Sequence, residues 1–155
     1  MVTYSELCQL NGGCMGCCGH DFISKDLIKL SIHKNTLEFK DLNPKNKSDL
    51  LKFRDRSFSS DLRDGVCRNL IEGKIGKKTG VHCPLHPSLN KNDDLRIGHC
   101  DTNYLCKTAK HFEKWSKKKK DLFLKFVKSK KLDDISYSIM MDKNKLLEEF
   151  DQFCL

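Results

Sequence analysis

The stretch CQLNGGCMGCCGH, residues 8–20, decides how this chain has to fold. Four of its positions are cysteine and four are glycine, a composition that suits neither a helix nor a strand. Cys14 and Cys17 form a Cys-x-x-Cys turn, which places two sulfurs on one side of a tight loop, as in many tetrahedral zinc sites. Cys18 follows directly. Because adjacent cysteines point apart, a third sulfur here indicates a cluster or two neighbouring metals.

A second cysteine region runs from Cys67 to Cys106. Within it, Cys83 and His86 have the spacing of a zinc knuckle, and Pro84 and Pro87 stiffen the turn around them. Five glycines between positions 65 and 98 favour short strands and tight turns over helices. Without Cys8 the two regions contain seven thiols, and with the imidazole of His86 these equal the eight ligands of two zinc sites. The predicted metal ligands are Cys14, Cys17, Cys18, Cys67, Cys83, His86, Cys100 and Cys106.

Two further cysteines stand outside this set. Cys8 lies six residues before Cys14 and is equally compatible with a ligand and with a buried thiol. Cys154 has Phe150, Phe153 and Leu155 as neighbours, a context typical of a core or free thiol.

The thiols are expected to be reduced. The N-terminus, MVTYSELCQL, contains an acidic residue and no apolar signal segment, which predicts a cytoplasmic protein. No run approaches the roughly 18 apolar residues of a membrane span, so we expect no membrane association. Nine cysteines are also an odd number for disulfide pairing. Metal coordination is therefore the expected use of these side chains.

The cysteine spacing resembles that of the CxxCxxCC-type cysteine-cluster family, described as zinc- or iron-chelating domains. The residues that carry the resemblance are Cys14-Met15-Gly16-Cys17-Cys18, Cys67-Arg68-Asn69-Leu70, Cys83-Pro84-Leu85-His86-Pro87 and Cys100. The likeness spans roughly residues 8–106, and Asn11 stands where the family has its leading cysteine. The resemblance implies metal chelation and no defined reaction.

The residues leave two cofactors open. The histidine candidates and the Cys-Pro-x-His knuckle favour zinc, which accepts nitrogen as readily as sulfur. The Cys17-Cys18 pair and the surplus of thiols favour an iron–sulfur cluster, although the closely spaced cysteine run of ferredoxins is missing from the sequence. We expect zinc, with an iron–sulfur cluster as the alternative.

The rest of the chain has helical spacing. Phe22–Lys34 predicts an amphipathic helix capped by Ser24, with an apolar face of Ile23, Leu27 and Leu30 to which Ile28 and Ile32 could also belong. A short helix is predicted after Ser48, and two helical segments cover Tyr104–Lys131 and Leu132–Phe153. The expected fold is an α-rich small metal-binding domain with irregular cysteine-rich loops, short strands and C-terminal helices. Residues 1–106 would form its cysteine-cluster part, and residues 107–155 a helical extension packed on it.

The net charge of +8 is concentrated in one segment, with eleven lysines and no arginine between positions 107 and 131. A lysine-rich helix can bind a phosphate backbone, so nucleic acid is a possible partner. The simpler interpretation is a solvated face balanced by the acidic residues of 133–151, because lysine reads base edges poorly. We expect the aromatic residues of this segment to pack in a core.

No catalytic motif stands out. The sequence contains no phosphate-binding glycine loop, HExxH motif or Gly-x-Ser-x-Gly elbow. Cys83 lies between His82 and His86 and could be an activated nucleophile, but the same triplet serves a metal knuckle. The leading hypothesis is a chiefly structural metal-binding protein. The alternatives are a nucleic-acid-binding module and an iron–sulfur redox protein or metalloenzyme.

Overall fold

The computed structural model describes residues 5–8, 22–75 and 77–154. Within these ranges the fold is mixed, with six α-helices and two small antiparallel sheets. The elements in chain order are α1 (Lys25–Leu42), α2 (Lys47–Asp55), β1 (Leu62–Arg63), β2 (Val66–Cys67), β3 (Ile71–Ile75), β4 (Lys78–His82), the 3₁₀ helix η2 (Pro87–Leu89), α3 (Lys107–Lys114), α4 (Lys117–Ser129), α5 (Asp134–Asp142) and α6 (Lys145–Phe153). The predominance of helix, the short strands of the second cysteine region and the C-terminal helices were all expected from the sequence.

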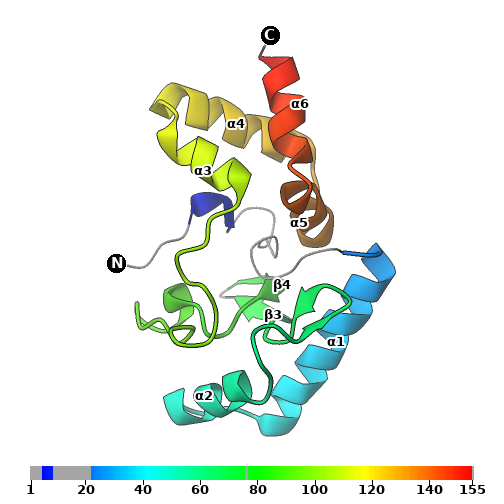
Figure 1. Ribbon diagram of the computed structural model, residues 1–155, viewed down its shortest axis with the longest axis vertical. Helices are drawn as coiled ribbons and strands as arrows, with labels where there is room; N and C mark the ends of the chain where they lie inside the picture. Colours follow the sequence, from blue (N-terminus) through cyan, green and yellow to red (C-terminus); the bar gives the residue numbers. More distant parts are fainter. Residues whose placement is uncertain (1–4, 9–21, 76, 155) are drawn as a thin grey trace.

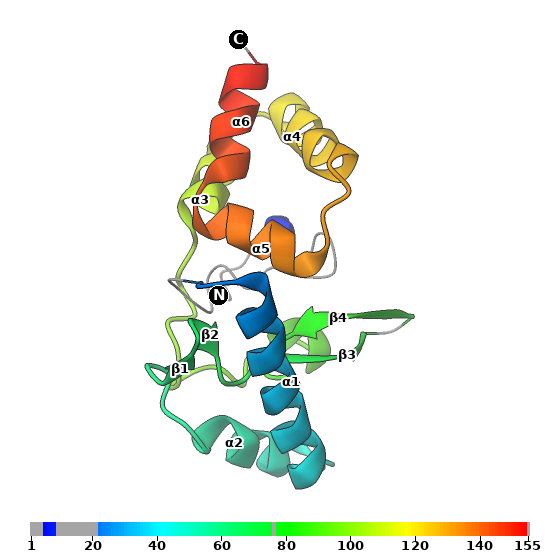
Figure 2. The same ribbon diagram turned by 90° about the vertical axis from the view of Figure 1, so that its right-hand side faces the viewer.

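The elements form two lobes, with α3 to α6 at one end of the molecule and α1, α2 and the strands at the other (Figures 1 and 2). The β1–β2 and β3–β4 pairs are separate hairpins, and α1 packs against β2 and β3. Each lobe has its own core. The helical core consists of Leu7, Ala109, Phe112, Phe123, Val127, Tyr137, Met141, Leu146 and Phe150. The hairpin core consists of Phe22, Ile28, Ile32, Val66, Leu70, Val81 and Ile135.

Helix α1 begins where the sequence predicts. The Ser24 hydroxyl caps it by accepting a hydrogen bond from the Leu27 N–H at 3.2 Å. The helix continues beyond the predicted end at Lys34 to Leu42, because no residue before Asn43 interrupts it. Asn43 adopts a positive φ of 47° and closes the helix.

The predicted apolar face of α1 is right for two residues and wrong for two others. Ile28 and Ile32 are buried, whereas Ile23 is 71% exposed and Leu30 is 45% exposed. The face that meets the hairpins also carries the buried polar residues Asn35 and Thr36. Because these two residues carry amide and hydroxyl groups, apolar spacing alone does not show that they belong to the buried face of α1.

The N-cap of helix α2 lies two residues before the predicted one. Asn46, and not Ser48, is its N-cap, and the Asn46 Oδ1 accepts a hydrogen bond from the Asp49 N–H at 2.9 Å.

Each predicted C-terminal helical segment is divided into two helices. Ser116 ends the first run and caps α4 by accepting from the Lys119 N–H at 3.3 Å. Asn144, with a φ of 57°, separates α5 from α6. The predicted core role of the aromatic residues is confirmed, since Phe112 and Phe123 are buried with their ring centroids 6.0 Å apart.

Two further expectations can be compared with the fold. Cys154 is an exposed free thiol, which confirms the second of its two predicted roles and rules out a core position. No helix in the described ranges combines the length and apolar character that crossing a bilayer requires.

Candidate metal centre

Three of the predicted ligands converge in the hairpin lobe. Cys67 ends β2, Cys83 directly follows β4, and Cys100 lies in the loop that leads to α3. Cys67 and Cys83 both pack against the hairpin core. The pKa of the Cys83 thiol is raised to about 12. Burial is the main cause, and the neighbouring thiols of Cys67 and Cys100 contribute to the increase. Three sulfurs from three separate segments are therefore within electrostatic reach of one another.

A turn begins at each of Cys67 and Cys83. The Leu70 N–H donates to the Cys67 carbonyl at 3.2 Å, and the His86 N–H donates to the Cys83 carbonyl at 3.1 Å. Burial raises the pKa of both thiols, and the nearby N–H groups of Asn69 and Leu70 at Cys67, and of Leu85 at Cys83, oppose that increase. Both sulfurs therefore belong to a hydrogen-bonded turn that fixes the direction of the backbone.

The turn at Cys67 is held from behind by α1. The fully buried Asn35 donates from its Nδ2 to the carbonyl oxygens of Cys67 and Leu70, at 3.0 Å each. The Arg56 guanidinium adds a hydrogen bond to the Asn69 Oδ1 at 2.9 Å and another to the Arg68 carbonyl. These contacts leave the turn little freedom, so the position of the Cys67 sulfur is set by α1 and by the residue that follows α2.

The loop between Cys83 and Cys100 is ordered by an ion pair. Asp94 is buried and binds Arg96 through two hydrogen bonds, from Nε at 2.8 Å and from Nη2 at 2.9 Å. Burial raises the pKa of the Cys100 thiol, and the positive charge of Arg96 acts in the opposite direction there and at Cys83. Arg54 of α2 donates to the Leu95 carbonyl at 3.1 Å and fixes the loop on the lobe.

His86 is not brought to these thiols. It caps η2, where its Nδ1 accepts from the Ser88 N–H at 3.1 Å and lies 2.7 Å from the Ser88 hydroxyl. Burial, reinforced by the charge of Arg96, lowers the pKa of His86 to about 4. The Nδ1 of His86 thus serves as the cap of η2, a role that zinc-knuckle spacing does not predict.

Cys106 lies apart from the three converging thiols. It is the N-cap of α3 and packs against the helical core, where the neighbouring thiol is that of Cys8. Cys14, Cys17 and Cys18 fall outside the described residues. The eight predicted ligands are therefore divided, with Cys67, Cys83 and Cys100 together, His86 and Cys106 elsewhere, and three that the structure does not describe.

The described residues do not form a complete metal site. Over residues 5–8, 22–75 and 77–154, no group of three or more His, Cys, Asp and Glu side chains is arranged closely enough to hold a metal ion. None of the six described cysteines is in a disulfide. A metal at Cys67, Cys83 and Cys100 thus requires the sulfurs to draw together around it, or a further donor.

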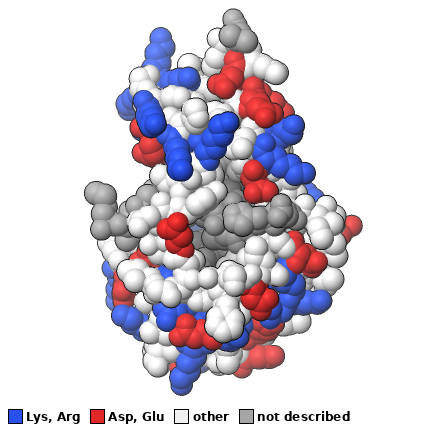
Figure 3. Space-filling model, in the orientation of Figure 1, with Lys and Arg blue, Asp and Glu red and all other residues white. Residues whose placement is uncertain are grey.

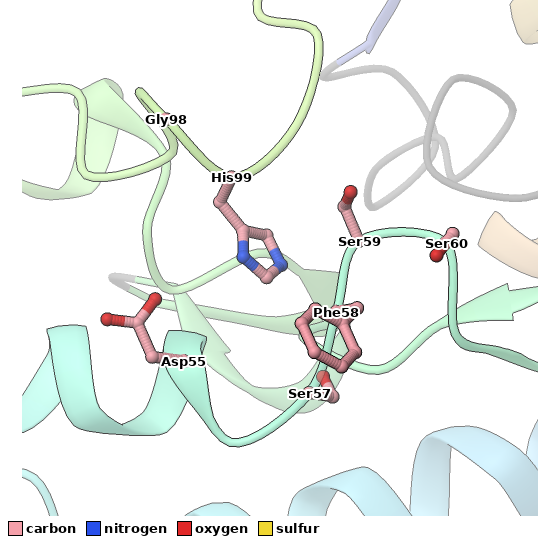
Figure 4. A pocket seen from close by; sticks show the side chains of 7 residues that line it. All are labelled: Asp55, Ser57, Phe58, Ser59, Ser60, Gly98 and His99. Atoms are coloured by element: carbon pink, nitrogen blue, oxygen red, sulfur yellow. The ribbon is translucent and has the colours of Figure 1, made fainter.

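An open cavity of about 390 Å³ lies beside the loop that carries Cys100. His99 projects into it between Asp55 and Phe58, and three serines line the opposite side (Figure 4). The His99 Nε2 lies 3.1 Å from the Nδ2 of Asn69, which belongs to the turn of Cys67. Within the described part of the chain no hydrogen bond joins His99 to a serine, so the nucleophile–base pair of a hydrolase is not formed there.

No family model matches this chain, and neither a curated protein nor a solved structure does. The resemblance to the cysteine-cluster family stays a prediction.

Sequence reasoning missed the residues that position the thiols, namely Asn35, Arg56, Asp94 and Arg96. One signal was present for Asn35, which continues the helical spacing of Ile28 and Ile32 with a polar side chain. For the other three residues the sequence contains no comparable pattern.

Proposed function

We propose that this protein binds a thiophilic metal ion, zinc in the first place, with Cys67, Cys83 and Cys100 among its ligands and with a chiefly structural role for the metal. The observation that carries the proposal is that three thiols from separate segments gather in one lobe, where Cys67 and Cys83 pack against the same core and Cys100 acts electrostatically on both. Zinc is held by thiolates, usually four donors in all. The fourth donor is proposed to come from the predicted ligands Cys14, Cys17 and Cys18.

The chain length permits such a donor. Phe22 belongs to the hairpin core against which Cys67 and Cys83 pack. Cys18 precedes Phe22 by four residues, and four residues of extended chain span at most about 14 Å. The connection therefore keeps Cys18 within reach of this part of the lobe.

The electrostatics favour a bound cation. A partly buried thiolate loses hydration, which is why burial raises the pKa values of Cys67, Cys83 and Cys100. Arg96 offsets only part of this effect, and its charge is shared with Asp94. A divalent metal stabilises several thiolates at once and releases their protons when it binds.

An iron–sulfur cluster remains the alternative occupant, with a redox or enzymatic role. Thiolates bind iron as well as zinc, and His86, the nitrogen donor that favoured zinc, is engaged in a cap. Absorbance near roughly 400 nm and a brown colour in the purified protein identify a cluster, whereas a colourless sample with bound zinc supports the first proposal.

The test is the metal content of matched variants, measured by elemental analysis of the purified full chain. Cys67→Ser and Cys83→Ser are expected to lower zinc per chain, because a hydroxyl is a poor substitute for a thiolate. Cys154→Ser is the control, since this exposed thiol lies at the opposite end of the fold. Wild-type protein that carries no metal after expression in zinc-supplemented medium contradicts the proposal, and so does equal loss from all three variants.

A second candidate function is the binding of a phosphate backbone by α3 and α4. Of the eleven lysines between 107 and 131, only Lys117 and Lys130 form ion pairs with described residues, to Asp121 and Glu149. The acidic segment 133–151 was expected to balance the lysines. Its other members act elsewhere, as in the Asp133–Lys25 and Glu148–Lys145 pairs. Figure 3 shows basic side chains spread over this end of the molecule.

This second candidate is tested by the salt dependence of nucleic-acid binding. Lys107, Lys110 and Lys114 lie at helical spacing on one exposed side of α3, and Lys118 follows in α4. Four phosphate contacts predict a log–log slope of about −3 to −4, which the four Lys→Gln changes should abolish. The control converts four exposed lysines of the other lobe, Lys29, Lys34, Lys40 and Lys45, and changes the net charge equally. Weak binding that both quadruple variants reduce alike marks a non-specific effect of charge and refutes this function.

A further inference from the structure

We propose that Cys8 and Cys106 form a second site for a thiophilic divalent metal ion, separate from that of Cys67, Cys83 and Cys100. The inference rests on the proposed function, since it concerns how the thiols of this protein are divided between metals. It also gives a role to Cys8, which the sequence left open between a ligand and a buried thiol.

Cys106 has a thiolate-binding environment of its own. As the N-cap of α3, its sulfur accepts a hydrogen bond from the Ala109 N–H at 3.4 Å. The positive end of the helix dipole lies at the same place. Burial raises the pKa of this thiol, and the hydrogen bond and the dipole act in the opposite direction.

Cys8 is held beside Cys106 by the helical core. The preceding residue, Leu7, is fully buried in the core against which Cys106 packs. The Tyr137 hydroxyl donates to the Leu7 carbonyl, and the Cys8 N–H donates to the Ser5 carbonyl at 3.0 Å. Residues 5–8 form a short turn that lies beneath α3 in Figure 1. Residues 5–8 and the start of α3 thus pack against the same core, and the thiols of Cys8 and Cys106, from distant parts of the chain, act electrostatically on each other.

A second observation points to a ligand at this end of α3. The Thr108 side chain is fully buried in the first turn of α3, and its hydroxyl has no hydrogen-bond partner among the described residues. A buried hydroxyl without a partner costs free energy, so native proteins rarely leave one unsatisfied. A metal-bound water or a further donor at this site would provide the missing partner.

The two groups of thiols belong to different cores. Cys67 and Cys83 contact the hairpin core, and Cys106 contacts the helical core. Cys100 and Cys106 are only six residues apart in sequence, yet different groups act on them. The charges that act on the Cys100 thiol are those of Arg96, Asp94 and Asp101. The Cys106 thiol is influenced by the thiol of Cys8. The two groups of thiols therefore lie in different parts of the fold.

Metal binding at Cys8 and Cys106 exchanges protons for a metal ion and involves no redox step. Cys8 and Cys106 each lose a proton to solvent, and the two thiolates neutralise one Zn²⁺ or Cd²⁺. They supply two of the four ligands that zinc requires, and the remaining positions go to water or to other thiolates of the chain.

The first test uses the wild-type full chain. Zinc-loaded protein is treated briefly with iodoacetamide, before and after removal of zinc by a chelator, and alkylation is mapped by mass spectrometry. Cys8 and Cys106 should react at least about tenfold more slowly in the zinc-loaded protein, because a metal-bound thiolate is a poor nucleophile. Cys154 should react equally in both samples. Equal reactivity of Cys8 with and without zinc overturns the second site.

The second test counts metals. Wild type should hold about two Zn²⁺ per chain, and Cys8→Ser, Cys106→Ser and Cys67→Ser should each retain about one. Cys106→Ser keeps a good N-cap residue, so loss of metal from it does not reflect loss of the helix start. If Cys8→Ser and Cys106→Ser keep the wild-type content while Cys67→Ser loses zinc, the second site is wrong and the first stands. If every variant loses all zinc, the thiols form one shared site and the division is wrong. Wild type without zinc overturns both proposals.

Discussion

Replacing Asn35 by alanine should disturb the thiol site from inside α1, without touching a sulfur. Its Nδ2 is the hydrogen-bond donor to the carbonyl oxygens of Cys67 and Leu70, and the side chain is fully buried. Each buried carbonyl left without a partner costs about 1–3 kcal/mol. Because Cys67 is only partly buried and water can reach its carbonyl, we expect a total loss of about 2–4 kcal/mol in the free energy of unfolding.

The loss should be visible in two measurements. For a chain of this size each kcal/mol lowers the melting temperature by about 2–4 °C, so Asn35→Ala should melt about 5–15 °C lower. The zinc affinity, measured by competition with a chelating dye, should fall about 10- to 100-fold, as when other supports of metal ligands are removed. The reason is that the loosened turn no longer holds the N–H groups of Asn69 and Leu70 near the Cys67 sulfur.

The matched control is Asn46→Ser, which replaces an exposed asparagine by another good N-cap residue. Its stability should change by less than about 0.5 kcal/mol, with no effect on zinc affinity. If Asn35→Ala loses less than about 1 kcal/mol, the carbonyls find other partners and α1 does not position the turn. If stability falls but zinc affinity does not, the turn contributes to folding alone and Cys67 is not a ligand.

Three other variants test the supports around the two sites. Glu38 pairs with Arg56 and Arg63, and although burial opposes it, their hydrogen bonds lower the pKa of this carboxyl. Wild type should therefore lose stability as the pH falls below about 4, whereas Glu38→Gln, less stable by about 1–3 kcal/mol at neutral pH, should lose less in acid. The hydrogen bond from Lys25 lowers the pKa of Asp133 to about 2, so its contribution, present at higher pH, disappears between about pH 4 and 2. Asp133→Asn, which retains a cap for α5, should flatten that part of the acid titration followed by circular dichroism, and an unchanged profile would contradict the pairing. Leu7→Ala should cost about 2–5 kcal/mol in urea unfolding, because Leu7 fills the helical core, and a loss below about 1 kcal/mol would show that residues 5–8 are not anchored there.

Helix starts were predictable where a single side chain decides them. Ser24 begins α1 as expected, because an N-cap acts on N–H groups only three residues away. The breaks at Ser116 and Asn144 were missed, since apolar spacing runs through both positions. At Ser116 a side-chain cap prevails over the periodicity, and at Asn144 a left-handed backbone conformation does.

The buried face of α1 could not be predicted from apolar spacing. Leu30 and Ile23 look like core residues in the sequence, yet they face away from the hairpins. The helix instead turns Asn35 and Thr36 inward, where the Thr36 hydroxyl accepts from the Glu72 N–H at 3.0 Å. Which side chains of a helix bond to the backbone of a neighbouring segment depends on tertiary packing, so the sequence pattern of the helix alone does not predict them.

The grouping of the cysteines could not be predicted. Their number, their spacing and their glycine-rich surroundings indicate metal binding, which stays a prediction. Which thiols meet depends on long-range packing. Cys100 and Cys106 are close in sequence, yet one faces the hairpin lobe and the other caps a helix of the other lobe. His86 has knuckle spacing and is taken by a cap instead.

Helix α5 explains why the two groups of thiols depend on one fold. Ile135 belongs to the hairpin core, whereas Tyr137 and Met141 belong to the helical core. The Asp134 carboxylate accepts from the Val81 N–H at 3.0 Å, at the strand that leads into Cys83. Tyr137, one turn along, donates to the Leu7 carbonyl beside Cys8. A single short helix thus contacts the segments that carry Cys83 and Cys8, so the positions of the two groups of thiols are linked through α5.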